Sequence, residues 1–407
     1  MQSVNERRNE LSKKVAISLV FRENPELALK LREYINKLFE KLKEKNGSNF
    51  KLKIMDFCGT HEWTITHYGL RSLMPEGLEL VAGPGCPVCI TPSKDVEAVV
   101  KLSLEGVTVY TYGDAYRLRA LNPVNGAYSL SDAKTLGGDV RVVTSFYDAV
   151  VNAKKLGKAS VFFAIGFETV APGYAKALLA RAVPENLKIL SSVRLTPPAM
   201  FYSLSILREK PPEPPVMGVI APGHVSTIVG AKAWVPVAEA FEIPVVIAGF
   251  EPIDVLLAIA SILRQLLQRK AEVEIEYKRA VTFDGDLSAQ SAIAKVFETV
   301  DAAWRGIGFL PRSGLELREE YSEYNARREY GIKPEGPQEW RKDTPPGCKC
   351  AEVVLGKAKP TDCPLFMKAC TPSNPYGPCM VSSEGTCAIW ARFGGWAVED
   401  IARELEI

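Results

Sequence analysis

The sequence lacks the features that mark three broad classes of protein. Its most apolar long run, residues 252–267, contains Asp254 and Arg264 and is too short to span a bilayer. Its 50 basic residues nearly balance 48 acidic ones, and no dense basic block is present, so we expect no nucleic-acid partner. The first residues are charged from Glu6 onward and contain no apolar signal core. We therefore expect no membrane segment, no secretory signal and a cytoplasmic location.

Two nucleotide-binding signatures are also missing. The sequence contains no G-x-x-x-x-G-K-[ST] motif, and no G-x-G-x-x-G motif follows a predicted strand. A loop that cradles phosphate groups is therefore not indicated, and chemistry that depends on ATP or NAD is not expected.

Cysteine, by contrast, is concentrated near the C-terminus. Six of the nine cysteines lie within 40 positions: Cys348, Cys350, Cys363, Cys370, Cys379 and Cys387. In a reducing compartment such clustering favours a metal or redox role over structural disulfides. The paired C-x₂₋₄-C units of zinc ribbons are absent from this C-terminal stretch, apart from the tighter C-x-C at 348 and 350. Four widely spaced thiolates suit a [4Fe–4S] cluster. Two cysteines would then remain as a dithiol or disulfide pair.

The central part of the chain has the pattern of parallel α/β sheets. From about residue 51, short Val- and Ile-rich runs alternate with helical patterns of ten or more residues. The predicted strands are 52–57, 78–82, 107–112, 140–144, 159–165, 187–193, 216–221 and 244–248. Helices are expected over 24–46, where Asn24 and Pro25 form a start signal, and from 252 to about 269.

These elements predict three regions. The first α/β domain spans 48–150, completed by about 245–275, and the second spans 151–245. The third region combines an N-terminal helix, 1–47, with 276–407 and is expected to be mainly helical or irregular. A chain that joins two similar α/β units can cross between them more than once, so the limits between 150 and 280 are the least defined.

The loops after the predicted strands carry the polar and thiol residues. They read CGTHE (58–62), GPGCPVC (83–89), YGD (112–114), GFET (166–169), PGH (222–224) and GFEP (249–252). Parallel sheets bind ligands at the carboxyl ends of their strands. We therefore expect Cys58, Cys86 and Cys89 to lie on one rim.

The C-x-x-C spacing of Cys86 and Cys89 is typical of a dithiol/disulfide couple, and a helix that begins near Pro92 would lower a thiolate pKa. Ordinary buried cysteines are the alternative. A structural zinc site would need a fourth ligand, and only His61 lies near in sequence. A zinc or iron site with an open position stays open as a further alternative.

Four other polar residues are candidates for the site, and His61 is the strongest of them. His61 shares a predicted loop with Cys58, so its imidazole can orient or ligate, and Glu62 lies beside it. His224 follows another strand. Glu168 is equally well explained as part of a helix N-terminus that Thr169 caps.

Together these motifs closely resemble the HypD family of hydrogenase maturation proteins. The match includes CGTHE, GPGCPVC, GFET, PGHV and the closing C-x-C…CPLF…C-x-P…GPCMVSSEGTC, in the same order from about residue 50 to the end. The resemblance implies two related α/β domains and a third region with a [4Fe–4S] cluster. It also implies a scaffold that works with the small chaperone HypC to assemble the Fe(CN)₂CO unit of nickel–iron hydrogenase.

The resemblance also assigns roles to individual residues. Cys58 matches the family's iron-binding cysteine, His61 its essential neighbour, and Cys86 and Cys89 its redox-active pair. Four cysteines match the cluster ligands, and two are left as a disulfide pair. The ligands are Cys348, Cys363, Cys370 and Cys387, and the pair is Cys350 and Cys379.

The expected function is therefore a redox-active maturation scaffold rather than a conventional turnover enzyme. It would bind iron through Cys58 and supply electrons while a HypE-type protein donates cyanide. One alternative is a stand-alone Fe–S-dependent thiol–disulfide oxidoreductase that acts on a protein substrate. Another is a zinc-stabilised binding module without a redox role.

Overall fold

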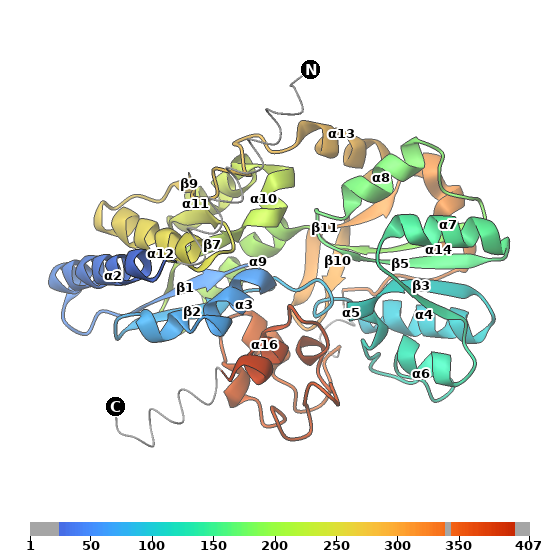
Figure 1. Cartoon of the computed structure of the whole chain (residues 1–407), viewed down its shortest axis with the longest axis horizontal. Coiled ribbons are helices and arrows are strands. Elements are labelled where there is room, and N and C mark those ends of the chain that lie inside the picture. Colours follow the sequence, from blue (N-terminus) through green and yellow to red (C-terminus); the bar gives the residue numbers. More distant parts are fainter. Residues whose placement is uncertain (1–23, 338–342, 395–407) are drawn as a thin grey trace.

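Two parallel β-sheets form the framework of the chain (Figure 1). The computed structural model describes residues 24–337 and 343–394. The first sheet has the order β2 (Leu78–Ala82), β1 (Leu52–Asp56), β7 (Val216–Pro222), β8 (Val245–Ala248) and β9 (Val273–Ile275). The second has the order β4 (Val140–Val143), β3 (Thr108–Tyr112), β5 (Ser160–Gly166) and β6 (Leu187–Val193). All neighbouring strands in both sheets are parallel.

Helices follow most strands and cover the two sheets. They are α2 (Pro25–Asn46), α3 (Gly59–His67), α4 (Ser93–Leu104), α5 (Gly113–Tyr116), α6 (Leu130–Thr135), α7 (Phe146–Leu156), α8 (Ala171–Leu179), α9 (Thr196–Glu209), α10 (Gly223–Val229), α11 (Val235–Phe241) and α12 (Pro252–Leu267). Their starts follow local capping chemistry. Ser145 and Asp148 form a capping box on α7, and the Asn24 side chain accepts a hydrogen bond from Leu27 N.

All eight predicted strands are present, with ends that differ from the predicted ones by one residue at most. The fold class is thereby confirmed as parallel α/β sheets with a separate cysteine-rich region. Strand prediction succeeded because these runs are buried almost throughout, and every residue of β1 and β5 is buried. Continuous burial produces an apolar run that is visible in the sequence.

The sheets divide the chain differently from the predicted ranges. Strands β3 and β4 fall within 48–150, yet they belong to the second sheet, where β3 pairs with both β4 and β5. Strand β7 falls within 151–245, yet it lies between β1 and β8 in the first sheet. The chain thus crosses between the sheets more than once. Successive β–α units look alike in sequence, and the partner of each strand depends on contacts with distant residues.

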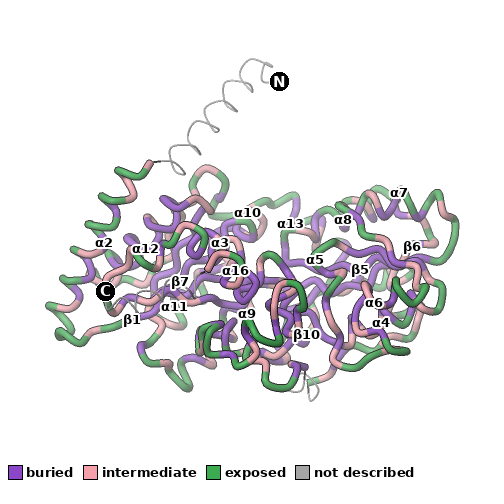
Figure 2. Tube along the Cα trace, turned by 60° about the horizontal axis from the view of Figure 1, so that its bottom comes forward, coloured by how far each residue is buried: buried purple, intermediate pink, exposed green. Residues whose placement is uncertain are grey.

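Helix α2 belongs to the first sheet rather than to the third region. Its apolar residues Ile35, Phe39 and Leu42 share one core with Ile259 and Leu263 of α12. Lys45 Nζ also donates a hydrogen bond to the carbonyl oxygen of Leu267, at 3.1 Å. Figures 1 and 2 show the two helices side by side at one end of the molecule. The prediction had placed this helix with the C-terminal part.

The C-terminal part contains a β-hairpin that was not predicted. The antiparallel strands β10 (Phe297–Trp304) and β11 (Gly308–Leu317) form this hairpin. The same part of the chain contains the helices α13 (Leu287–Val296), α14 (Ala326–Glu329), α15 (Cys350–Val354) and α16 (Thr386–Phe393). Residues 1–23, 338–342 and 395–407 of the predicted third region lie outside the described residues. No helix in the described ranges is long and apolar enough to cross a membrane.

Candidate functional site

A cleft of about 570 Å³ lies where the carboxyl ends of both sheets meet the C-terminal part of the chain. Cys58 follows β1, Pro87 follows β2, and Asp114 and His224 follow β3 and β7. Glu384, just before α16, completes the wall. The rim expected from strand order therefore exists, and it is built from both sheets rather than from one.

Cys58 caps the N-terminus of α3 in this wall. The backbone N–H groups of Thr60 and His61 face its sulfur and favour the thiolate. Burial outweighs them, and with the nearby Glu384 carboxyl it raises the pKa of Cys58 to about 12. The thiol therefore keeps its proton at neutral pH unless a cation binds the sulfur in its place.

Two glycines let three chain segments converge around Cys58. A Cβ atom on Gly85 would lie 2.6 Å from the Cys58 backbone nitrogen. A Cβ atom on Gly59 would lie 2.5 Å from the carbonyl oxygen of Glu384. Neither gap admits a side chain without backbone movement. The CGTHE and GPGCPVC motifs thus contain glycine because their loops touch each other and the C-terminal segment.

His61 is held as a neutral ring of defined tautomer. Its Nε2 atom lies 2.9 Å from the carbonyl oxygen of Gly249 and 3.2 Å from that of Ala248. Carbonyl oxygens only accept, so the proton is on Nε2. Nδ1 is buried and has no hydrogen-bond partner among the described residues. Burial lowers the pKa of His61 to about 4, which leaves Nδ1 as a free lone pair.

His224 belongs to the same aromatic stack. Phe250 packs between the two imidazoles, with ring centroids 5.0 Å from His61 and 3.9 Å from His224. His224 is partly exposed in the cleft wall, and burial lowers its pKa. His224 lies at the start of α10, directly after β7, and its ring contacts that of Phe250, which in turn contacts the ring of His61.

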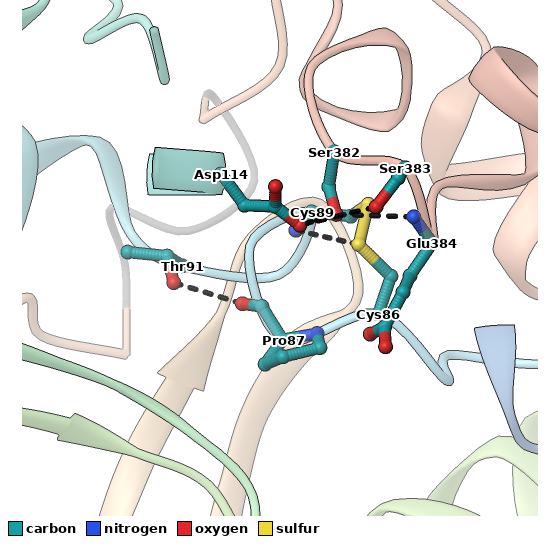
Figure 3. The surroundings of a disulfide bond; sticks show 8 residues. All are labelled: Cys86, Pro87, Cys89, Thr91, Asp114, Ser382, Ser383 and Glu384. Atoms are coloured by element: carbon teal, nitrogen blue, oxygen red, sulfur yellow. Dashed lines mark hydrogen bonds between the residues drawn. A yellow bond between two sulfur atoms is a disulfide. The ribbon is translucent and has the colours of Figure 1, made fainter. Parts of the chain in front are cut away.

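Cys86 and Cys89 are joined by a disulfide bond, with Cα atoms 5.4 Å apart (Figure 3). Both residues are buried, and the N–H of Cys89 donates to Cys86 Sγ at 3.2 Å. The bond lies beside the Ser382–Glu384 segment, which is tied to the second sheet by Asp114. Asp114 Oδ2 accepts hydrogen bonds from the hydroxyls of Ser382 and Ser383 at 3.0 and 3.3 Å.

The six C-terminal cysteines gather in one place. Cys348 Sγ lies 3.3 Å from Cys350 Sγ, and hydrogen bonds continue from Cys350 to Cys379 and from Cys379 to Cys387. Cys370 accepts a hydrogen bond from Gly377 N at 3.3 Å and interacts with Cys363 and Cys387. All six are free cysteines, so Cys350 and Cys379, the expected dithiol/disulfide pair, are in the dithiol form.

Proton sharing among these thiols shifts their acidities in opposite directions. Hydrogen bonds from Cys348 and Cys379 lower the pKa of Cys350. The same hydrogen bonds, together with burial, raise the pKa of Cys348 and of Cys379. Cys350 is therefore the group in this chain of thiols that most readily becomes a thiolate.

The six cysteines are compatible with a metal cluster. Among the described residues, no three His, Cys, Asp or Glu side chains are arranged to hold one metal ion. A [4Fe–4S] cluster is held by four cysteine thiolates around a larger centre. Six sulfur atoms from well-separated positions, five of them on buried residues, provide that chemistry with two to spare.

Glu62 points away from the cleft and joins α3 to the cysteine-rich part. Its carboxylate accepts hydrogen bonds from Trp390 Nε1 and Arg71 Nη2, both at 2.6 Å. It also accepts from Thr66 Oγ1 at 3.0 Å. Trp390 lies on α16, the helix that carries Cys387. Glu62 thus connects the Cys58 helix to the helix that carries Cys387, and its carboxylate is engaged in these hydrogen bonds.

Glu168 is likewise engaged outside the cleft. Its carboxylate accepts hydrogen bonds from Thr196 N at 2.7 Å and Thr196 Oγ1 at 2.9 Å, at the first residue of α9. Burial raises its pKa to about 7. The interpretation of the GFET loop as a helix N-terminus that Thr169 caps was wrong, because Val170 occupies the N-cap position of α8 and no side chain caps it. Glu168 instead binds the first residue of α9.

We expect Glu168 to make stability depend on pH. Its folded pKa of about 7 exceeds the ordinary value of 4.5, so its stabilising contribution is present below pH 4.5 and is lost as pH rises through 7. The loss amounts to about 3 kcal/mol. Denaturant unfolding of the native protein and Glu168→Gln between pH 4 and 8 measures it. A difference between the two that does not change with pH would contradict the prediction.

Sequence patterns missed four groups at the site. Asp56 ends β1, where burial raises its pKa, and its Oδ2 atom has no hydrogen-bond partner among the described residues. Ser382, Ser383 and Glu384 arrive from the far end of the chain. Asp56 lies two residues before Cys58, the first residue of the CGTHE loop, and this proximity was the one local indication that Asp56 belongs to the site. Nothing local indicated that the SSEG segment would reach Cys58.

The fold and site define an α/β protein whose cleft wall carries one thiol, Cys58. The disulfide is buried in the loop that supplies Pro87 and Val88 to that wall, and the neutral imidazole of His61 is buried three residues after the thiol. The model of the HypD family, described as "Hydrogenase formation hypA family", matches residues 33–394. The chain therefore belongs to the HypD family and is a hydrogenase maturation factor.

Named relatives match along most of their length. A hydrogenase expression/formation protein of Methanocaldococcus jannaschii is 42% identical over 375 residues, 90% of this chain and 97% of that protein. The hydrogenase maturation factor HypD of Azotobacter vinelandii is 38% identical over 347 residues, 84% of this chain and 89% of its own. That of Escherichia coli is 37% identical over 372 residues, 89% of this chain and 95% of its own.

Proposed function

We propose that the chain is the scaffold on which the Fe(CN)₂CO unit of a nickel–iron hydrogenase is assembled. The observation that carries this proposal is Cys58, a protonated thiol at a helix N-terminus in the wall of a cleft of about 570 Å³. Iron that arrives as cargo would displace the thiol proton and bind the sulfur. A cysteine of a HypC-type chaperone would share the metal, and two single-cysteine anchors would allow its later release.

His61 would assist Cys58 without carrying a charge. Its free Nδ1 lone pair can accept a hydrogen bond or bind the incoming metal, and its Nε2–H is fixed by two carbonyl oxygens. Because burial lowers its pKa to about 4, it stays neutral near pH 7 and does not repel a metal cation. The Phe250 stack fixes the plane of the ring.

The Cys86–Cys89 couple would supply the electrons for cyanide attachment. A HypE-type carrier bears cyanide as R–S–C≡N. Cleavage of its S–C bond takes two electrons and one proton and gives R–SH and cyanide. Oxidation of the Cys86–Cys89 dithiol to the disulfide releases two electrons and two protons. Both electrons and one proton go to the cleavage, and the second proton is released to solvent when the metal binds cyanide as an anion, so the step balances.

The cysteine-rich part would restore the dithiol. Cys348, Cys363, Cys370 and Cys387 would hold a [4Fe–4S] cluster, which supplies one-electron reduction when bound. Cys350 and Cys379, already in hydrogen-bonding contact, would pass between dithiol and disulfide. Their position between Cys348 and Cys387 supports the pairing that family resemblance implies.

Infrared spectroscopy tests the assembly role. We expect the protein, co-purified anaerobically with its HypC-type partner, to show cyanide and carbonyl stretching bands that Cys58→Ala abolishes. Thr169→Ala, at another position in the cleft wall, is the matched control and should keep the bands. Bands that persist in Cys58→Ala would overturn the proposal.

A second function is favoured by the buried disulfide next to the cysteine cluster. A stand-alone Fe–S-dependent thiol–disulfide oxidoreductase would use Cys86 and Cys89 on a protein substrate and would not need Cys58. Turnover with a disulfide substrate that is unaffected by Cys58→Ala, together with absent infrared bands in the native protein, would establish this function instead.

A further inference from the structure

The turn between β10 and β11 inserts a buried arginine next to the disulfide loop. Arg305 is only 3% exposed. Its backbone N–H donates to the carbonyl oxygen of Ile90 at 2.9 Å, one residue after Cys89. Its side chain donates from Nη1 to the carbonyl oxygen of Arg119 and from Nε to that of Asp343, both at 2.8 Å. One residue thus joins three distant segments.

Asp343 extends this contact to the start of α4. Its carboxylate oxygens accept hydrogen bonds from Ser93 N at 3.2 and 3.0 Å. Its Oδ1 lies 3.7 Å from Arg305 Nε, and both side chains are almost fully buried. The loop that contains the disulfide is therefore anchored at Ile90 by the Arg305 backbone and at Ser93 by the Asp343 carboxylate. The Arg305 side chain supports both anchors, because its two hydrogen bonds fix the position of the turn and its charge balances the carboxylate.

The same turn also touches the cysteine-rich part. A Cβ atom on Gly306 would lie 3.1 Å from Ala351 Cβ, so α15 packs directly against the turn. Gly306 has φ +71°, a conformation that glycine adopts without strain. Arg305 also interacts electrostatically with Cys350. The turn is therefore the physical link between the Cys86–Cys89 loop and the helix that carries Cys350.

Neighbouring side chains keep the turn rigid. Trp304 is fully buried, stacks on Phe167 of the cleft wall with centroids 5.9 Å apart, and donates from Nε1 to Ser313 Oγ at 2.9 Å. Arg194 Nε donates to the carbonyl oxygen of Ala303 at 3.0 Å. A rigid turn can restrain a loop that it contacts, whereas a mobile turn could not.

We propose that Arg305 is the positioning residue that holds the Cys86–Cys89 loop in its disulfide-forming conformation against the cysteine-rich part, and so sets the thiol–disulfide equilibrium of that pair. The inference deepens the proposed function and rests on it for the biological meaning of the equilibrium. Two thiols form a bond more readily when the chain holds them close, because their effective concentration is higher. Anchors at Ile90 and Ser93 supply that restraint.

Equilibration with dithiothreitol measures the effect on the native, full-length chain. Two electrons pass from the two thiols of dithiothreitol to the Cys86–Cys89 bond, the protein gains two thiols, and the reagent forms its own disulfide. After alkylation, trypsin releases residues 72–94, a peptide whose only cysteines are Cys86 and Cys89. Mass spectrometry of this peptide reports the pair without interference from the other seven cysteines.

Arg305→Met keeps the backbone hydrogen bond to Ile90 but loses both side-chain hydrogen bonds and the charge that balances Asp343. We expect the loosened turn to shift the equilibrium toward the dithiol by about tenfold. Arg305→Lys keeps a charge near Asp343 but cannot bind both carbonyl oxygens, so an intermediate shift of about threefold is expected. Asp343→Asn retains an oxygen acceptor for Ser93 and provides a second variant should Arg305→Met not fold. It should shift the equilibrium in the same direction.

Arg327→Lys is the matched control. Because Arg327 pairs with Asp95, two residues from the Ser93 anchor, it serves only as a control for lost packing, and Arg279→Lys is the independent one. Arg279 pairs with the buried Asp254 at the start of α12 in the first sheet, so its replacement should lower the unfolding temperature without moving the equilibrium by more than about twofold. An equilibrium that is unchanged in Arg305→Met, Arg305→Lys and Asp343→Asn would overturn the inference and leave the proposed function intact. A native pair that does not exchange with dithiothreitol would instead count against the redox part of the proposed function.

Discussion

Anaerobically purified protein in which any one of Cys348, Cys363, Cys370 or Cys387 is replaced by serine is expected to contain less than about a quarter of the native iron and acid-labile sulfide. A [4Fe–4S] cluster needs four cysteine ligands, and a serine hydroxyl is a poor substitute for a thiolate. Iron and sulfide analysis, together with the visible absorption near 400 nm that such clusters give, measures the result.

Cys350→Ser and Cys379→Ser are the matched controls in the same 40-residue segment. Both residues are buried among the other thiols, so their replacement perturbs packing to a similar degree. We expect both variants to keep their iron and sulfide. Loss of iron from all six variants alike would show that the division into four ligands and two redox cysteines is wrong. Zinc in place of iron in the native protein would favour the binding-module alternative.

The strands could be predicted from local sequence because most of their residues are buried and therefore apolar. Phe162 lies within the continuous apolar run VFFAI and is fully buried in β5. Sheet membership could not be predicted in the same way. Strand β7 pairs with β1 across more than 150 residues, and no local pattern distinguishes it from a neighbour of β6. The hairpin β10–β11 was missed because residues 297–301 are mostly exposed or half-buried.

The candidate site, like the fold, could be predicted only where local sequence determines it. Cys58, Cys86 and Cys89 were predicted to share a rim because each follows a strand, and parallel strands end on the same side of a sheet. The direction in which side chains point was not predictable. Glu62 and Glu168 lie in the right loops, yet Trp390 and Thr196 bind their carboxylates outside the cleft. Arg305 and Asp343, from 216 and 254 residues beyond Cys89, carry no motif at all.

The arrangement gives a physical reason for housing the two cysteine systems in one chain. The disulfide is shielded from solvent and lies beside Ser382–Glu384, which immediately precede the helix of Cys387 (Figure 3). A neighbouring group within the protein can reach a buried pair faster than small thiols do, so it can set the redox state of the pair, while a long incubation with dithiothreitol still brings the pair to equilibrium. Glu62, Asp114 and Arg305 each tie the cysteine-rich part to a different side of the cleft.

Cys86→Ser, Cys89→Ser and the double variant are expected to lower hydrogenase maturation in cells by at least about a hundredfold, and all three to the same extent. The two thiols act as one unit, because neither alone can form the disulfide or release two electrons. Removing both therefore costs no more than removing one. Hydrogenase activity in a strain that lacks its own copy of this maturation factor measures the effect.

Val88→Ala is the matched control, since Val88 lies inside the same loop and is equally buried, and it should retain most of the activity. Iron and sulfide content should be native in every one of these variants, because the cluster cysteines are intact. That combination separates loss of electron supply from loss of the cluster. If a single variant kept substantial activity while the double variant lost it, the remaining thiol would be acting alone as a nucleophile or ligand. The dithiol/disulfide role would then be wrong, whereas the scaffold role of Cys58 would stand.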